Sequence, residues 1–267
     1  MMRIAAGVEY CGADFSGWQS QSGQRTVQAC VEAAISVVAD HLVQVQCAGR
    51  TDAGVHAVHQ VIHFDTTALR EPRSWVLGAN TKLPHDINLL WAQPAANDFN
   101  SRFSALSRRY KYLILNRPVR SALNHKILTC ERNQLDVVRM AVAARDLVGE
   151  HDFTSYRAVS CQARTPVRQI KKLEVSRKGS VVIIEVEANA FLHHMVRNIA
   201  GVLMTIGKGD KPAGWAKEVL HARDRTAGGV TALADGLYLM EVCYEEKFAI
   251  PRQDNGLHVL ERYGLIY

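Results

Sequence analysis

Short runs of alternating hydrophobic and polar residues fill the first third of the chain, separated by stretches with helical spacing. Ile4, Ala6 and Val8 alternate with their neighbours, which predicts a strand over residues 3–10. A Gly-rich loop follows, and then Thr26 stands where a helix N-cap is expected. The pattern predicts helices over residues 27–38 and 72–81, and strands over residues 43–48, 58–65 and 87–92.

The second half of the chain repeats these signals in outline. Residues 109–116 have strand composition, and Asn133 is the expected cap of a helix with apolar positions from Leu135 to Leu147. Two further runs are joined by Lys178-Gly179, which is a hairpin signal. The remaining predicted elements are strands over 168–177, 180–188 and 236–244, and helices over 194–206 and 215–221.

This repeated order of elements predicts an α+β protein of two related halves. Each half is expected to be an antiparallel sheet flanked by helices, and the halves are expected to meet at a central basic cleft. We expect one half over residues 1–105, carrying a candidate catalytic loop, and the other over 106–245. Residues 246–267 form a C-terminal tail.

Composition narrows the class of protein. The chain has 267 residues, of which 48% are hydrophobic and 22% charged, as in ordinary soluble globular proteins. No apolar run approaches the ~20 residues that span a membrane, and no signal peptide is visible, so we expect a cytoplasmic protein. None of the six cysteines forms a C-x-x-C pair. Free thiols are therefore favoured over disulfides, and no zinc framework is indicated.

The net charge of +6 and the pI of about 9.1 modestly favour a polyanionic partner. The basic residues are also grouped along the chain. A single group of this kind is most simply a solvated face, but three on one chain raise the odds of phosphate contacts. The groups are Arg102, Arg108, Arg109 and Lys111; Arg164, Arg168, Lys171, Lys172, Arg177 and Lys178; and Lys208, Lys211, Lys217, Arg223 and Arg225.

The candidate catalytic residue is Asp52, which lies in a loop between two glycines. Gly49 and Gly54 let the backbone turn sharply and approach another molecule closely. The short residues between them leave the carboxylate free to project, as in reactive groups that loops present from a rigid scaffold. Asp and Gly are also ordinary turn residues, so the local pattern by itself favours a surface turn.

Residues well beyond this loop point to a known family. The loop and several later motifs resemble, in the same order, those of the tRNA pseudouridine synthase A family. One departure is Leu233, where the family usually has a proline. The matching motifs are Tyr10 to Gln21, Gly49 to Ala57, Tyr110-Lys111-Tyr112 with Asn116-Arg117, Asp152 to Ser155, Phe191 to Asn198 and Gly236 to Leu239.

The resemblance implies a cofactor-independent isomerase that converts uridine to pseudouridine in the anticodon stem-loop of tRNA, at positions 38 to 40. It also implies a homodimer. Asp52 is the expected nucleophile, either at the sugar or on the base. Arg197 matches the family's second basic residue and would pair with Asp52 across the cleft, which keeps a carboxylate ionised. An ordinary ion pair is the alternative for Arg197.

Three more residues are carried over as substrate-binding candidates. Tyr110 would stack on the flipped base and relay a proton, although it also fits a sheet-face tyrosine. Arg50 would contact phosphate or hold the flipped-out nucleotide, or it merely stabilises the loop. Leu237 would line the uracil pocket, or it belongs to the core.

Two rival hypotheses come from other classes. One is a non-catalytic RNA-binding protein on the same fold, which would bind RNA by stacking and charge. The other is a metalloenzyme built on His56, His59 and His63, which fall within eight residues. Metal ligands must converge and need supporting partners, and this spacing does not favour that, so no metal site is expected. His193 and His194 are expected to cap a helix or meet RNA.

Overall fold

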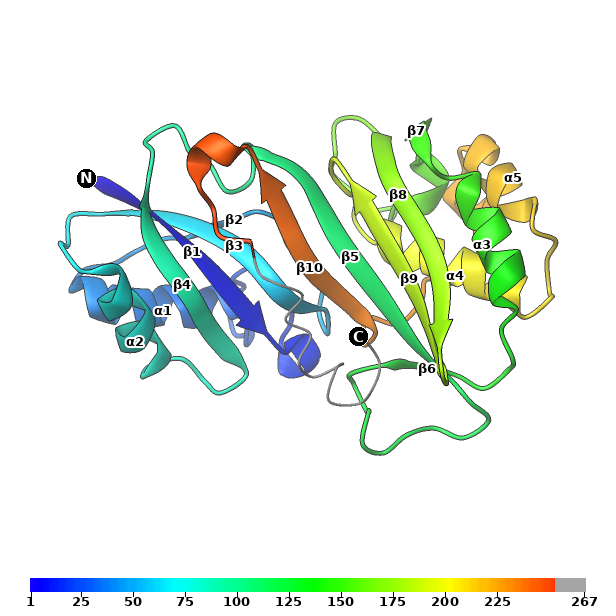
Figure 1. The fold of residues 1–267 in the computed structure, drawn as a ribbon, viewed down its shortest axis with the longest axis horizontal. Coiled ribbons are helices and arrows are strands. Elements are labelled where there is room, and N and C mark those ends of the chain that lie inside the picture. Colours follow the sequence, from blue (N-terminus) through cyan, green and yellow to red (C-terminus); the bar gives the residue numbers. More distant parts are fainter. Residues whose placement is uncertain (253–267) are drawn as a thin grey trace. The chain divides into compact units, whose positions relative to one another are not determined.

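The computed structural model describes residues 1–252, which divide into two compact units (Figure 1). Unit 1 contains Met1–Leu106 together with the described residues from Tyr238 onward, and unit 2 contains residues 107–237. The last strand thus belongs with unit 1, whereas the sequence pattern grouped it with residues 106–245. Of the expected tail over 246–267, the structure describes a short 3-10 turn, η4 (Glu246–Phe248), and the residues up to 252. The tail beyond that point lies outside the described residues.

The sheet of unit 1 has the strand order β4-β1-β3-β10. Its strands are β1 (Met2–Tyr10), β3 (His56–Thr66), β4 (Ile87–Ala95) and β10 (Leu237–Tyr244). Neighbours run antiparallel, except that β10 lies parallel to β3 where Tyr238 pairs with His56. A short strand, β2 (Gln46–Cys47), also pairs with β3, at the other end of that strand. Each of these strands overlaps one predicted from the alternation of hydrophobic residues.

Two helices cover one face of this sheet, α1 (Val27–Ala39) and α2 (Pro72–Asn80) (Figure 1). The rings of Phe64 and Trp75 pack edge to face at 5.2 Å, which ties β3 to α2. Thr26 is the N-cap residue of α1, as predicted, but its hydroxyl accepts no capping hydrogen bond. The hydroxyl is buried and has no hydrogen-bond partner, so Thr26 occupies the N-cap position without the side-chain bond to a backbone amide that usually favours it.

The sheet of unit 2 has the order β5-β9-β8-β7 and is antiparallel throughout these four strands. The strands are β5 (Ala105–Asn116), β9 (Val181–Ala188), β8 (Val167–Lys178) and β7 (Gly149–Asp152). The predicted hairpin is the β8–β9 pair. A short strand, β6 (Thr129–Glu131), runs parallel to β5. The sequence pattern missed β6 and β7 because both are too short to show a period.

The helices of unit 2 are α3 (Val137–Arg145), α4 (Met195–Gly207) and α5 (Trp215–Ala222). The unit also contains two 3-10 turns, η2 (Thr154–Tyr156) and η3 (Arg225–Ala227). The predicted cap of α3 was wrong. Asp136, not Asn133, is the N-cap, and its carboxylate accepts from the amide of Arg139 at 3.0 Å. The Asp side chain lies three residues before that amide, which is the spacing a cap requires.

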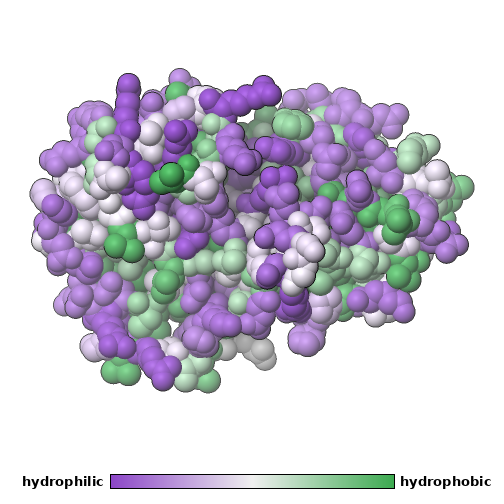
Figure 2. All heavy atoms as spheres, turned by 180° about the vertical axis from the view of Figure 1, so that it is seen from behind, coloured by the Kyte–Doolittle hydropathy of each residue, from purple (hydrophilic) through white to green (hydrophobic). Residues whose placement is uncertain are grey.

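Each unit is thus a mainly antiparallel sheet with helices packed on it, which confirms the predicted α+β class of two related halves. All six cysteines are free thiols within residues 1–252, as expected for this class. No helix in that range is long and apolar enough to cross a membrane. On the face that Figure 2 shows, hydrophobic residues form small separate groups in a mostly hydrophilic surface. Such scattered groups are normal for a globular protein.

Candidate functional site

The Asp52 loop, residues 49–55, is held on both sides of its carboxylate. The amide of Trp18 donates to the carbonyl of Thr51 at 3.0 Å, and the Tyr10 and Thr51 hydroxyls are hydrogen-bonded at 2.8 Å. On the other side, the amide of Gly54 donates to the carbonyl of Phe15 at 3.4 Å. Asp52 itself is half-buried. The loop therefore presents one carboxylate from a backbone that its neighbours fix.

Two glycines of the preceding loop permit this close fit. Gly12 lies against the backbone of Val55, where an added Cβ would come within 1.9 Å of the carbonyl oxygen. Gly17 has φ +91, and a Cβ there would lie 2.8 Å from the carbonyl oxygen of Thr51. A side chain at either position would displace the Asp52 loop. The Tyr10 to Gln21 motif thus serves as the base on which the loop rests.

The start of β3 completes this frame. The imidazole Nδ1 of His56 accepts from the amide of Gly12 at 3.1 Å, and the ring stacks on Tyr238 with centroids 4.5 Å apart. Cys47 lies two residues before Gly49, and desolvation raises its pKa to about 12. It therefore stays a thiol at neutral pH and is a poor nucleophile. Arg50 is exposed.

Arg197 lies in the first turn of α4 in unit 2. Its Nε donates to the carbonyl of Ala232 at 2.8 Å, and the amide of Ala232 donates back to the carbonyl of Arg197 at 3.2 Å. The loop before β10 therefore fixes the base of the guanidinium. Gly201, one turn further along α4, lets the loop approach the helix this closely. A Cβ at Gly201 would lie 2.0 Å from the carbonyl oxygen of Val230, two residues before Ala232.

A buried hydrogen-bond network, which the sequence pattern missed, ties the same loop to α4. The side-chain oxygen of Asn198 accepts from the Arg225 guanidinium at 3.1 Å and from the Thr231 hydroxyl at 2.7 Å. Its side-chain amide donates to the carbonyl of Tyr156 at 2.7 Å. Arg225 had been grouped with possible phosphate ligands, but it contributes to this internal network.

Tyr110 and Leu237 are both buried in the structure. Tyr110 is 7% exposed and packs edge to face on Phe191, with centroids 5.1 Å apart. Leu237 begins β10 and is 5% exposed. Leu233 stands where the family usually has a proline. Its carbonyl accepts a hydrogen bond from the hydroxyl of Tyr112 at 2.8 Å. This bond fixes the local loop shape without the proline.

Asp52 and Arg50 belong to unit 1, while Tyr110 and Arg197 belong to unit 2. Each unit supplies its part of the predicted site with firm local support. The pairing of Asp52 with Arg197, and the roles assigned to all five residues, stay predictions.

The first two basic groups are partly neutralised within the sheet of unit 2. Glu185 on β9 lies 3.5 Å from Lys111, 3.6 Å from Arg109 and 3.4 Å from Lys172. Burial would raise the pKa of Glu185, but the three cations outweigh it, so its pKa falls below the usual value. Glu185 is therefore ionised at neutral pH, and it orders three cations on one face of the sheet.

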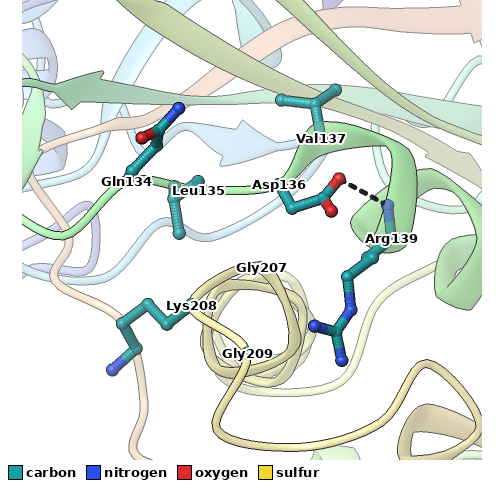
Figure 3. Close-up of a pocket in the computed structure, with 8 residues that line it drawn as sticks. All are labelled: Gln134, Leu135, Asp136, Val137, Arg139, Gly207, Lys208 and Gly209. Carbon is teal, nitrogen blue, oxygen red and sulfur yellow. Dashed lines mark hydrogen bonds between the residues drawn. The ribbon is translucent and has the colours of Figure 1, made fainter.

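A crevice of about 520 Å³ lies where α3 begins and α4 ends, and its lining residues are drawn in Figure 3. None of the predicted site residues lines it. Its charged groups already have protein partners: Lys208 lies 3.2 Å from Asp210, Arg139 donates to the carbonyl of Lys211, and Asp136 caps α3. These charged groups therefore stabilise the ends of α3 and α4.

The three histidines of β3 serve different partners. His56 accepts from Gly12, His59 Nε2 accepts from the Trp91 indole at 2.9 Å, and His63 Nδ1 is hydrogen-bonded to Ser101. Burial lowers the pKa values of His59 and His63 to about 4. Both are neutral at pH 7. His194 is the N-cap residue of α4 by position, with φ +62, but its side chain makes no capping bond.

Comparison with known proteins agrees with the motifs. The model of a family described as tRNA pseudouridine synthase matches residues 6–104 and again 143–245, one stretch from each predicted half. A tRNA pseudouridine synthase A from Alcanivorax borkumensis is 55% identical over 96% of both chains. One from Methylococcus capsulatus is 57% identical over 94% of this chain and 93% of its own. One from Coxiella burnetii is 53% identical over 96% of this chain and 98% of its own.

Among solved structures, a chain from a crystal structure of a Cbf5-Nop10-Gar1 complex is 15% identical, with a TM-score of 0.33. The match covers 75% of this chain and 45% of that one, and a likeness this slight has no bearing on function. The family model and the near full-length relatives carry the assignment instead. On their strength, and with the Asp52 loop framed as described, the chain belongs to the tRNA pseudouridine synthase family.

Proposed function

We propose that this protein is a cofactor-independent isomerase that converts uridine to pseudouridine in the anticodon stem-loop of tRNA, at positions 38 to 40. The observation that carries the proposal is the Asp52 loop, a half-buried carboxylate on a backbone held by Tyr10, Trp18 and Phe15. The sequence around it matches relatives named for this reaction along nearly their whole length.

The reaction rearranges bonds within one nucleotide. The bond between C1′ and N1 of uracil breaks, the base turns, and C1′ bonds to C5. The C5 proton is lost and N1 gains one, so substrate and product are isomers and no redox partner is consumed. Asp52 is the proposed nucleophile, which splits this rearrangement into two easier steps. The uridine must leave its stem to reach the carboxylate.

The other predicted residues complete the proposal. Arg197 supplies the counter-charge of Asp52 when the two units work together, which keeps the carboxylate ionised as the site closes on RNA. Tyr110 supports the flipped base, Leu237 lines its pocket and Arg50 meets the phosphate backbone. The enzyme acts as a cytoplasmic homodimer, in which one tRNA contacts both subunits.

Replacing Asp52 tests the chemistry. Asp52→Asn keeps the size of the side chain but removes the nucleophilic charge. It should abolish release of tritium from tRNA labelled at C5 of uridine, while tRNA affinity stays within about threefold. Asp40→Asn is the matched control, because Asp40 is exposed and its left-handed backbone accepts Asn readily. Tritium release by the Asp52 variant near the wild-type rate would refute the mechanism. If wild-type protein binds tRNA but releases no tritium, it is an RNA-binding protein instead.

Replacing Arg197 tests the counter-charge. Arg197→Ala should lower kcat by about 10²- to 10³-fold, as loss of an electrostatic partner does in other active sites, and Arg197→Lys should restore part of it. Arg145→Ala on the exposed face of α3 serves as the control. Equal kcat in the Ala variant and wild type would remove Arg197 from the site.

The oligomeric state tests the homodimer. Sedimentation equilibrium should give about twice the chain mass of 29.7 kDa at micromolar protein. A mass that stays at one chain across the concentration range would contradict the dimer.

A further inference from the structure

The pairing of β2 with β3, which leads into the Asp52 loop, continues through a side chain after its last backbone hydrogen bond. β2 and β3 pair with Gln46 opposite His63 and Cys47 opposite Ile62, and the amide of Ala48 donates to the carbonyl of Val61 at 2.8 Å. The same register places Gly49, the first residue of the loop, opposite Gln60. The backbone of Gln60 pairs with Val8 of β1 on the other side.

The side chain of Gln60 takes the place of the next backbone rung. The amide of Gly49 donates to its Oε1 at 3.3 Å, and its Nε2 donates to the carbonyl of Gly49 at 2.6 Å. The residue is 0% exposed. A carboxamide carries a donor and an acceptor side by side, which matches the carbonyl and the amide of Gly49. With an apolar residue at position 60, both backbone groups of Gly49 would be left without this partner.

The two ends of the loop are thus fixed by different devices. Gln60 holds Gly49, while Tyr10, Trp18 and Phe15 hold Thr51 and Gly54. Asp52 follows Thr51 directly, and Gly49 lies two residues before Thr51, so the direction of the carboxylate depends on both sets of contacts. Freeing Gly49 would let residues 49 and 50 shift and would leave Thr51 held only by Tyr10 and Trp18, even where the rest of the fold stays intact.

We propose that Gln60 is a positioning residue, which aims the Asp52 carboxylate by clamping Gly49 through paired amide hydrogen bonds. The inference rests on the proposed function. Gln60 is fully buried and acts only through the loop backbone. A displacement of about 1 Å at a reacting group can cost about 10²-fold in rate. We therefore expect a kcat effect of that order when the clamp is lost, with tRNA binding retained.

Two substitutions separate the clamp from simple packing. Gln60→Met keeps the length of the side chain and removes both hydrogen bonds. It should lower kcat for pseudouridine formation by about 10- to 100-fold and leave KM for tRNA within about threefold. Gln93→Met is the control, because the Gln93 amide donates to the carbonyl of Ala249 in the same unit, away from the loop.

Gln60→Glu gives a signature that a packing role would not produce. An ionised carboxylate cannot donate to the carbonyl of Gly49, but a protonated one can. Burial favours the protonated form, so it becomes populated well above the pH at which an exposed Glu titrates. The ratio of kcat in this variant to kcat in wild type should therefore rise at least fivefold as the pH falls from 8 to 5.5. The same ratio for Gln60→Met should stay flat.

The outcomes separate the inference from the proposed function. If wild-type protein forms no pseudouridine, the proposed function fails. If wild type is active, the inference is overturned when Gln60→Met keeps kcat within twofold, or when the Glu ratio is flat in pH. Far-UV circular dichroism and thermal unfolding establish that each variant is folded. If neither variant folds, Gln60 is a structural residue and the inference is also overturned.

Discussion

At the scale of single residues, the Asp52 loop depends on positions that have no side chain at all. Gly12 and Gly17 let two loops touch through their backbones, and Gly201 does the same for Arg197 in unit 2. The motif around Asp52 could be found from sequence because its residues are contiguous. Gln60 could not be found that way, because its function depends on which backbone group the strand register places beside it.

Gly17→Ala should lower both the stability and kcat, and the loss of kcat should exceed what backbone strain at a glycine position causes. Its φ of +91 would cost a side chain about 1–2 kcal/mol, and the added Cβ would also press on the Thr51 carbonyl. Gly23 provides the matched control, since its φ is +71 and a Cβ there meets nothing within 4 Å.

Both variants should therefore lose similar stability from the backbone, but Gly17→Ala alone should lose kcat, by about 10²-fold. Urea unfolding and tritium release from labelled tRNA measure the two effects. Matching kcat values for the two variants would show that the contact with Thr51 does not aim the loop.

At the scale of elements, most helices and strands could be predicted from periodicity, since long amphipathic segments carry a strong pattern. The starts of the helices could not. Asp136 and Asn133 are both good capping residues, and Asp136 is selected because its own amide donates to the carbonyl of Gly207 at the end of α4. That tertiary contact sets where α3 begins, and it is not encoded in the local pattern.

Asp136→Ala should lower the free energy of unfolding by about 1 kcal/mol, because the amide of Arg139 loses its capping acceptor. Asn133→Ala is the comparison, since the side chain of Asn133 does not cap α3. It should change the free energy by less than about 0.5 kcal/mol, as surface substitutions usually do. Urea unfolding of the two variants decides between the two caps. A larger loss in the Asn133 variant would overturn the assignment.

The strand β3 should make unit 1 sensitive to acid. His59 is 1% exposed, and burial lowers its pKa from 6.5 to about 4. Between these values the unfolded chain binds a proton that the folded chain does not, so stability is present above pH 6.5 and is lost as the pH falls toward 4. The loss from His59 approaches about 3 kcal/mol at pH 4.

His59→Gln should reduce this pH dependence by about half, because glutamine keeps an acceptor for the Trp91 indole but does not titrate, while the buried His63 still does. His85→Gln, at an exposed histidine, is the matched control substitution. Urea unfolding at pH 4.5, 5.5 and 7 measures both. A wild-type stability that does not change between pH 7 and 4.5 would contradict a neutral, buried His59.

At the scale of the whole molecule, the sequence showed two related halves through the repeated order of their elements. It did not show that the last strand returns to unit 1, because the partner of a strand is set by three-dimensional pairing and not by its own pattern. The net charge could be read from composition, but its neutralisation around Glu185 required the register of β5, β8 and β9.

Binding to tRNA should weaken strongly with salt, since cations that contact phosphates release condensed counterions. With a net charge of +6, we expect the affinity for unmodified tRNA to fall more than tenfold between 50 and 200 mM KCl. Fluorescence anisotropy with labelled tRNA gives the slope. An affinity that is independent of salt would mean that phosphate contacts contribute little.

The pairing of β10 with β3 also determines when the sheet of unit 1 can be completed during synthesis of the chain. Residues 56 and 57 of β3 leave the ribosome about 180 residues before their parallel partners, Tyr238 and Leu239. At ordinary rates of synthesis that interval lasts about 10 to 40 s. Residues 107–237 of unit 2 are synthesised during this interval, before β10 is available to pair with the edge of β3 beside the Asp52 loop. Among the described residues, the unit that carries the Asp52 loop is thus begun first and completed last.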